Sequence, residues 1–270
     1  LNPKLSRTVP SQDLAHEPKW TRFPAAGVRT NTGIPTLSDF FQIKRGLATG
    51  NNKFFILPED QIRSRHLPME LFTPILPSHR YLSENEVASD TRGNPKIDRA
   101  RFFLNTKLPE SEIKRRFPRL HAYLEDGKKQ GLDQRYLCQH RSLWYAQENR
   151  PPSPIVCTYI GRGDTKSGRP FRFILNSSRA TVANVYLAMY PKPILARAME
   201  RDPGLIRRVW QALNKITPDD LLSEGRVYGG GLHKLEPREL ANVPVPEIAA
   251  LLPMNERPAK QTNFVSQFVL

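Results

Sequence analysis

The chain has 270 residues, of which 39% are hydrophobic and 25% are charged, so it can bury a sizeable core and does not resemble a disordered tail. Its 41 Lys and Arg residues exceed its 26 Asp and Glu residues, giving a formal net charge of +15. This excess favours a polyanionic partner, because each neutralised phosphate releases condensed counterions. The alternatives are a basic protein without such a partner and a membrane-surface protein. No long basic amphipathic helix supports the latter.

The two cysteines, Cys138 and Cys157, do not form a disulfide framework, which fits a reducing cytoplasm. The opening residues LNPKLSRTVP lack the apolar core of a signal peptide. No stretch approaches the ~20 apolar residues of a membrane-spanning helix. Because the first residue is Leu and not Met, we expect the chain to be a piece excised from a longer protein.

The first half of the chain predicts short strands and helices. Residues 1–36 read as an irregular segment or linker anchored by Trp20 and Phe23. Residues 40–57 predict a hairpin, with alternating apolar residues, turn residues at 46–53 and a second short strand at 54–57. A strand is expected at 101–105, a helix from Pro109 that breaks at Pro118, and a helical stretch over 132–145.

The second half returns to a period of two. Strands are predicted at 154–161 and 171–176 around a polar loop, and a third at 183–189. Pro193 then opens a helix, and a second helix over 204–215 carries an apolar stripe. These elements predict an α+β fold, rich in hairpins, with a main domain at 37–250 and a tail at 251–270.

Catalytic and metal-binding chemistry is not predicted. No Asn/Asp-Pro-Pro-aromatic loop is present, and the glycines at 161–164 follow a strand without the helix that a Rossmann-like nucleotide site needs. Cys138, His140 and Cys157 are possible soft ligands, but their spacing fits no familiar zinc pattern, so buried cysteines are the better interpretation. The carboxylates at 219–220 are better explained as a helix start than as a nuclease site.

The strongest candidates for nucleic-acid contact lie at the predicted hairpin tip. Glycines there let the backbone approach a phosphate, lysines and arginines flank them, and asparagines can donate to phosphate or read adenine edges. The alternative is an ordinary tight turn with a solvated basic rim. The candidate residues are Lys44, Arg45, Gly46, Thr49, Gly50, Asn51, Asn52 and Lys53.

Three further segments mix charge with aromatic rings or glycine. Tyr136 to Tyr145 suits base stacking, although Trp144 and Tyr145 can equally be core residues. In the strand 171–176, alternation puts two polar side chains on one face. A triple glycine at 229–231 forms a second basic loop. The candidates in these segments are Arg141, Trp144, Tyr145, Arg172, Asn176, Gly230, His233 and Lys234.

Four segments in order, 40–57, 135–145, 170–191 and 227–246, resemble the C-terminal target-recognition domain of TaqI-type N6-adenine DNA methyltransferases, including fused restriction-modification enzymes. The resemblance implies a double-stranded DNA partner and a cytoplasmic, nucleoid-associated bacterial protein. It also implies an upstream domain of the same polypeptide that binds S-adenosylmethionine and receives the flipped adenine. This chain itself is expected to bind no cofactor. Alternatives are a stand-alone specificity subunit, disfavoured because heptads are absent, and a metal-dependent nuclease.

Overall fold

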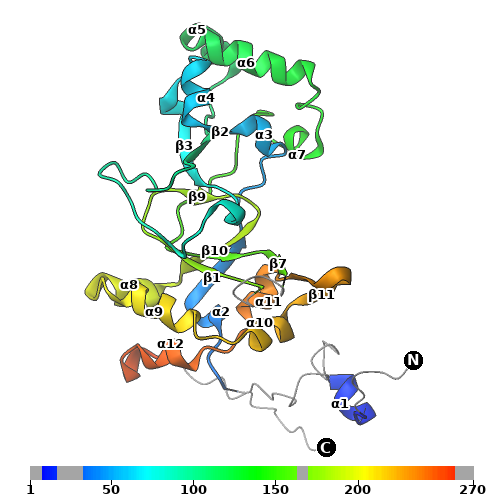
Figure 1. The fold of residues 1–270 in the computed structure, drawn as a ribbon, viewed down its shortest axis with the longest axis vertical. Helices are drawn as coiled ribbons and strands as arrows, with labels where there is room; N and C mark the ends of the chain where they lie inside the picture. Colours follow the sequence, from blue (N-terminus) through cyan, green and yellow to red (C-terminus); the bar gives the residue numbers. More distant parts are fainter. Residues whose placement is uncertain (1–7, 17–32, 163–169, 259–270) are drawn as a thin grey trace, which may run out of the picture. The chain divides into compact units, whose positions relative to one another are not determined.

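A computed structural model describes residues 8–16, 33–162 and 170–258 (Figure 1). Trp20, Phe23 and most of the polar loop after residue 161 lie outside the described residues. The chain divides into two compact units, both discontinuous in sequence. One consists of residues 1–43, 160–171 and 191–270, and the other of residues 44–159 and 172–190. Among the described residues, no helix has the length and apolarity required to cross a membrane.

The unit built from residues 44–159 and 172–190 contains two small sheets. In the first, β2 (Ile56–Pro58) and β3 (Phe72–Leu76) pair antiparallel with β5 (Arg101–Leu104), and β9 (Thr181–Val182) runs parallel to β3. The second sheet has the order β10 (Tyr186–Pro191), β6 (Ile155–Thr158), β8 (Phe173–Asn176) and β4 (Glu86–Val87). β1 (Phe41–Arg45) carries the chain from one unit into the other.

Helices pack against the first sheet, and together they enclose the largest hydrophobic core of this unit. Phe54, Leu104, Ile113, Leu120 and Leu124 are among the residues buried together there. A second cluster joins Val156, Ile174 and Ala188 of the second sheet to Leu76 and Val182 of the first. The helices of this unit are α3 (Asn52–Phe55), α4 (Glu59–Ser64), α5 (Glu110–Arg116), α6 (Pro118–Lys129) and α7 (Tyr136–Gln139), with short 3-10 turns η2 (Met69–Leu71) and η3 (His79–Tyr81).

The other unit is mainly helical, with one three-stranded antiparallel sheet in the order β11 (Arg226–Tyr228), β12 (Leu232–Lys234) and β7 (Ile160–Arg162). Leu195, Val209, Leu221, Leu240 and Ile248 are buried, one from each of five helices. Its helices are α1 (Ser11–His16), α2 (Leu37–Phe40), α8 (Pro193–Arg201), α9 (Leu205–Leu213), α10 (Pro218–Glu224), α11 (Pro237–Ala241) and α12 (Pro246–Ala250), with 3-10 turns η4 (Gly229–Gly231) and η5 (Met254–Glu256).

The predicted α+β class is confirmed, as are the strand near 101, the helix break at Pro118 and the helix that opens at Pro193. The stripe of the helix over 204–215 is confirmed as well. Val209 and Leu213 are fully buried, and Ile206 and Trp210 are half-buried. Proline punctuation and helical periodicity are local signals, so the sequence alone was sufficient for these elements.

The hairpin predicted over 40–57 is wrong. Residues 52–55 form α3, and β2 pairs with β5, placing Ile56 opposite Phe103. The Asn51 side chain accepts a hydrogen bond from the backbone N–H of Lys53 and caps the helix, a role that asparagine often fills. Consecutive Phe54 and Phe55 are both buried, which a half-buried strand with alternating faces does not allow.

Two other boundaries also differ from prediction. In the stretch 132–145 only Tyr136–Gln139 is helical, because the chain turns on both sides to bury Leu132 and Tyr145 in one core. Of the predicted strand 183–189 only residues 186–189 are extended, as part of β10, because the chain first makes a turn in which the Tyr186 N–H donates to the Ala183 carbonyl. Both differences arise from tertiary packing that local periodicity does not encode.

Candidate nucleic-acid interface

The start of the glycine- and asparagine-rich loop, residues 46–53, is fixed by backbone contacts. The Gly46 N–H donates to the Tyr186 carbonyl at 3.0 Å, and the Leu47 N–H donates to the Val182 carbonyl at 2.8 Å. A Cβ on Gly46 would lie 2.6 Å from the Val182 oxygen and even closer to that of Ala183. The protein's own packing therefore explains Gly46, which sequence reasoning had attributed to the approach of a phosphate.

Two arginines hold the middle of this loop against the segment that follows α6. The Arg141 guanidinium donates to the carbonyls of Ala48 at 2.8 Å and Thr49 at 3.1 Å. Arg135 donates to the Gly50 carbonyl at 3.0 Å. Burial lowers the pKa of Arg141 from its ordinary value. The guanidinium stays charged, because the ordinary pKa of arginine is far above neutrality. Arg141, predicted as a DNA contact, thus has a loop-positioning role.

Gly50 packs directly against α7. Its φ is +83°, and a Cβ there would lie 3.0 Å from the Cys138 sulfur. Two motifs that are 85 residues apart in the chain are thereby joined into one surface. We call residues 50–53 and 135–140 together the loop–α7 surface.

The polar residues of the loop are partly committed to its own geometry. Buried Thr49 donates to the Asn52 amide oxygen at 2.6 Å, and Asn51 caps α3. Asn52 and Lys53 are exposed on the surface. Of the two basic residues before the loop, Lys44 is exposed, while Arg45 stacks over the Tyr159 ring at 4.1 Å and donates to the Asn184 carbonyl.

The aromatic residues that sequence reasoning selected lie in the core. Tyr145 is buried and donates to the Leu108 carbonyl at 2.6 Å, and Trp144 packs beside Phe54. The exposed pair is instead Tyr136 and His140, whose ring centroids are 4.3 Å apart. Their separation of four residues, which places two side chains on one helix face, was the signal that could have selected them.

Arg172 and Asn176 use their polar atoms within their own unit. Arg172 donates to the Leu82 carbonyl at 2.9 Å, the Glu84 carbonyl at 2.9 Å and the Asn85 side chain at 2.7 Å. Asn176 is buried, and its amide donates to two backbone carbonyls. These contacts give both residues a structural role that strand alternation did not indicate.

The second predicted loop is the tip of the β11–β12 hairpin, residues 226–234. Gly230 and Gly231 have φ of +72° and +69°, which favours glycine. Val227 and Tyr228 are exposed. Lys234 is ion-paired with Glu236 at 2.7 Å, and Arg226 with Glu239 at 2.7 Å. The Nδ1 atom of His233 is buried without a hydrogen-bond partner among the described residues.

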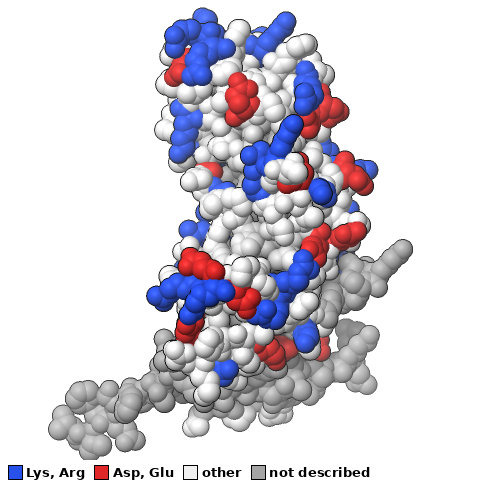
Figure 2. Space-filling view, turned by 90° about the vertical axis from the view of Figure 1, so that its left-hand side faces the viewer, with Lys and Arg blue, Asp and Glu red and all other residues white. Residues whose placement is uncertain are grey.

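The net positive charge is not gathered into one patch on the face drawn in Figure 2. Lys and Arg side chains are spread along it, with Asp and Glu side chains between them. Bulk charge therefore supports attraction to a polyanion but does not locate a contact surface. The candidate contact surface is defined by the loops described above and not by the net charge.

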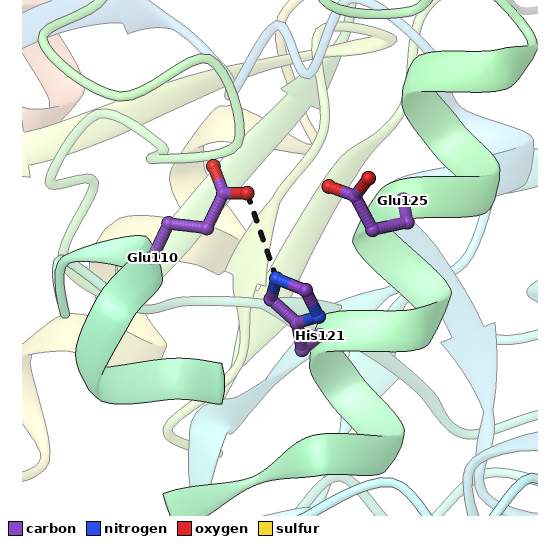
Figure 3. A group of neighbouring side chains, drawn as sticks. All are labelled: Glu110, His121 and Glu125. Carbon is purple, nitrogen blue, oxygen red and sulfur yellow. Dashed lines mark ion pairs between the residues drawn. The ribbon is translucent and has the colours of Figure 1, made fainter. Parts of the chain in front are cut away.

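One side-chain group has the composition of a metal site. The ligand atoms of Glu110, His121 and Glu125 lie within 4.8 Å of one another, between α5 and α6 (Figure 3). The Lys128 ammonium, however, lies 2.5 Å from Glu110 and 2.8 Å from Glu125. Its hydrogen bonds lower the pKa of Glu125 and raise its own pKa. The group is thus an ion network that joins the two helices.

Among the described residues, Cys138, His140 and Cys157 do not form a ligand group.

Comparison with known proteins identifies the family. Residues 24–266 match the family described as the C-terminal domain of the type II methyltransferase M.Eco57I. The chain belongs to this family of C-terminal domains, which confirms the resemblance seen in the sequence to the C-terminal part of a restriction-modification methyltransferase.

Two curated relatives agree with this assignment. The type II methyltransferase M.XamI of Xanthomonas campestris pv. amaranthicola is 28% identical over 90% of this chain and 42% of its own length. M.AccI of Acinetobacter calcoaceticus is 23% identical over 88% of this chain and 41% of its own length. The chain therefore spans less than half of the relatives it matches.

A solved structure of the type IIL restriction-modification enzyme MmeI in complex with DNA also matches. The match covers 66% of this chain and 23% of the MmeI chain, with a TM-score of 0.39 and 13% sequence identity. This likeness is too low to support an argument about function.

Proposed function

We propose that this chain is the sequence-specific DNA-recognition domain of a site-specific adenine-N6 DNA methyltransferase in a restriction-modification system. The observation that carries the proposal is the loop–α7 surface. It brings exposed Asn52, Lys53 and Arg135 together with an exposed aromatic pair on a backbone held by Arg141. Such a surface combines phosphate-binding cations with amides and rings that read bases.

The net charge of +15 supports a DNA partner. Cations that neutralise phosphates release counterions, so the affinity of this chain for duplex DNA is expected to fall steeply as salt rises. Sequence preference then arises from groups that reach base edges, because phosphate contacts carry no direct sequence information. The loop–α7 surface offers both kinds of group side by side, although they come from segments 85 residues apart in the chain.

The proposal includes a division of labour. S-adenosylmethionine and the catalytic loop belong to an upstream domain, and this domain holds the duplex while the target adenine flips into that pocket. Membership of the family and the greater length of the relatives support this division. The choice of adenine rests on the resemblance of the four sequence segments. A cytoplasmic location beside the nucleoid follows from the same function.

The test is a selection from a pool of randomised duplexes by the 270-residue chain at moderate salt. We expect one short sequence to be enriched, and the selected duplex to bind at least tenfold more tightly than a scrambled one, roughly the discrimination of one well-placed base contact. Failure to bind duplex DNA, or binding without enrichment, would contradict sequence-specific recognition. Magnesium-dependent cutting of a plasmid by the pure chain would instead indicate a nuclease.

A further inference from the structure

We propose that Tyr136 and His140 are a base-reading pair, in which the His140 Nε2 atom accepts a hydrogen bond from an exocyclic amino group in the DNA major groove. The Tyr136 ring packs against the base edge beside it. This inference rests on the proposed function, since it names the residues that supply sequence preference. It goes beyond that function because it predicts which bases are preferred.

The exposure of the two rings is the first observation. The Tyr136 side chain is 74% exposed, and His140 is exposed as well. Their ring centroids lie 4.3 Å apart with an interplanar angle of 39°. An aromatic ring stabilises a core through the area that it buries, so a tyrosine this exposed contributes little to the core. The fold therefore does not require Tyr136.

The hydrogen bond on the other side of the imidazole fixes which nitrogen is available. His140 Nδ1 lies 2.7 Å from the Tyr136 carbonyl oxygen. A carbonyl oxygen can only accept, so Nδ1 carries the proton and donates. In the neutral ring Nε2 is then an acceptor. The chain has thus prepared an exposed hydrogen-bond acceptor on a basic surface.

An acceptor at this position discriminates among bases. In the major groove adenine N6 and cytosine N4 present donors, whereas guanine presents only acceptors and thymine an acceptor and a methyl group. Phosphate oxygens also accept, so an imidazole nitrogen that accepts does not suit a phosphate contact. The geometry therefore favours adenine or cytosine at one position of the recognition sequence.

The support behind the pair keeps it in a defined place. Cys138 lies between the two residues on α7, is buried, and packs against Gly50. Arg135, directly before Tyr136, is bonded to the Gly50 carbonyl. Exposed Lys53 belongs to the same surface and supplies a phosphate contact that sets a duplex in register. Rigid support of this kind is what a specificity contact needs.

The experiment repeats the duplex selection with variants of the 270-residue chain. His140→Leu removes the acceptor, and we expect the preference for adenine or cytosine at one position to fall about tenfold. His140→Arg should move that preference to guanine, the base that arginine reads best. His140→Gln, whose amide oxygen accepts, should retain most of the preference. Tyr136→Ala should weaken binding of the selected duplex about tenfold.

Tyr81→Ala is the matched control, because Tyr81 is 55% exposed in the same unit but lies outside the loop–α7 surface. It should leave both affinity and preference unchanged. An unchanged selection profile for His140→Leu and His140→Arg would overturn the inference, as would an equal loss of affinity for every duplex. If Tyr136 and His140 instead docked another protein domain, the selection profile of these variants would be the same as that of the wild-type chain. If wild-type chain selects no sequence, the proposed function itself fails, which is a separate outcome.

Discussion

Two segments of this chain look alike in sequence and behave differently in the structure. Residues 46–53 and the hairpin 226–234 are both rich in glycine and adjoin basic residues. In the first, Gly46 and Gly50 are each pressed against another part of the unit. In the second, Gly229, Gly230 and Gly231 have no described atom within 4 Å of where a Cβ would lie.

The comparison teaches that glycines in similar loops have different physical origins, either close packing or a positive φ, and that some have neither. Gly46 is needed because backbone carbonyls leave no room for a side chain. Gly230 and Gly231 are explained by positive φ. Gly229 has neither a positive φ nor a close neighbour among the described residues. Packing and backbone conformation separate these cases, and amino-acid composition does not.

The largest effect is expected for Gly46→Ala. The new Cβ would overlap the Val182 and Ala183 carbonyl oxygens, which belong to backbone and cannot simply rotate away. We expect a loss of about 3 kcal/mol in the free energy of unfolding, at the upper end of typical overpacking costs. Urea denaturation measures it. A loss below about 1 kcal/mol, the bottom of the same range, would mean that the loop is not packed as described.

The second-largest loss of unfolding free energy is expected for Arg141→Ala. It leaves the carbonyls of Ala48 and Thr49 without their charged donor, and we expect a loss of about 2 kcal/mol, the order found for hydrogen bonds to charged groups. Arg141→Lys should rescue only part of it, because an ammonium lacks the planar fork that reaches both oxygens. Full rescue by lysine, measured by the same denaturation, would show that charge alone holds the loop.

The thiol of Cys138 reports on the closed loop. Burial raises the pKa of this thiol, so the reactive thiolate is scarcer in the folded state than in the unfolded chain. Alkylation near pH 8 should therefore be slow in the native protein and rapid in denaturant. Arg141→Ala should accelerate it by freeing the carbonyls of Ala48 and Thr49 and so exposing the thiol, an effect that outweighs the loss of an arginine charge that lowers the pKa of the thiol. Equal rates in native protein and denaturant would indicate an open loop.

The smallest effect is expected for Gly229→Ala. No described atom crowds the site and φ is not positive, so the change in unfolding free energy should stay within about 0.5 kcal/mol, as for ordinary surface substitutions. Similar losses of unfolding free energy for Gly229→Ala and Gly46→Ala would contradict the difference described between the two loops.

Local signals sufficed for part of this molecule. The α+β class, the helix break at Pro118 and the amphipathic α9 follow from proline and periodicity. The turn residues at 46–53 predict the tip of a hairpin, but the strand that follows them pairs elsewhere. β2 pairs with β5, some 45 residues away in the chain, and strand partners at such distances leave no local trace.

The candidate site was predictable to a similar extent. Sequence reasoning found both the loop and the aromatic segment, but it chose Trp144 over Tyr136. Both are aromatic residues near basic ones, but Trp144 packs against the core whereas Tyr136 is exposed. Arg172 and Asn176 were selected for charge and polarity, properties that serve internal hydrogen bonds equally well.

The most direct test of the account compares two lysines of equal charge in a salt titration of duplex binding. Lys53 lies on the loop–α7 surface, whereas Lys129 is an exposed lysine at the end of α6, ion-paired with Asp126. Lys53→Ala should reduce the slope of log Kd against log salt by about 1, the signature of one lost phosphate contact, and Lys129→Ala should leave it unchanged. Equal effects of the two variants, or binding that does not depend on salt, would contradict the placement of DNA on this surface.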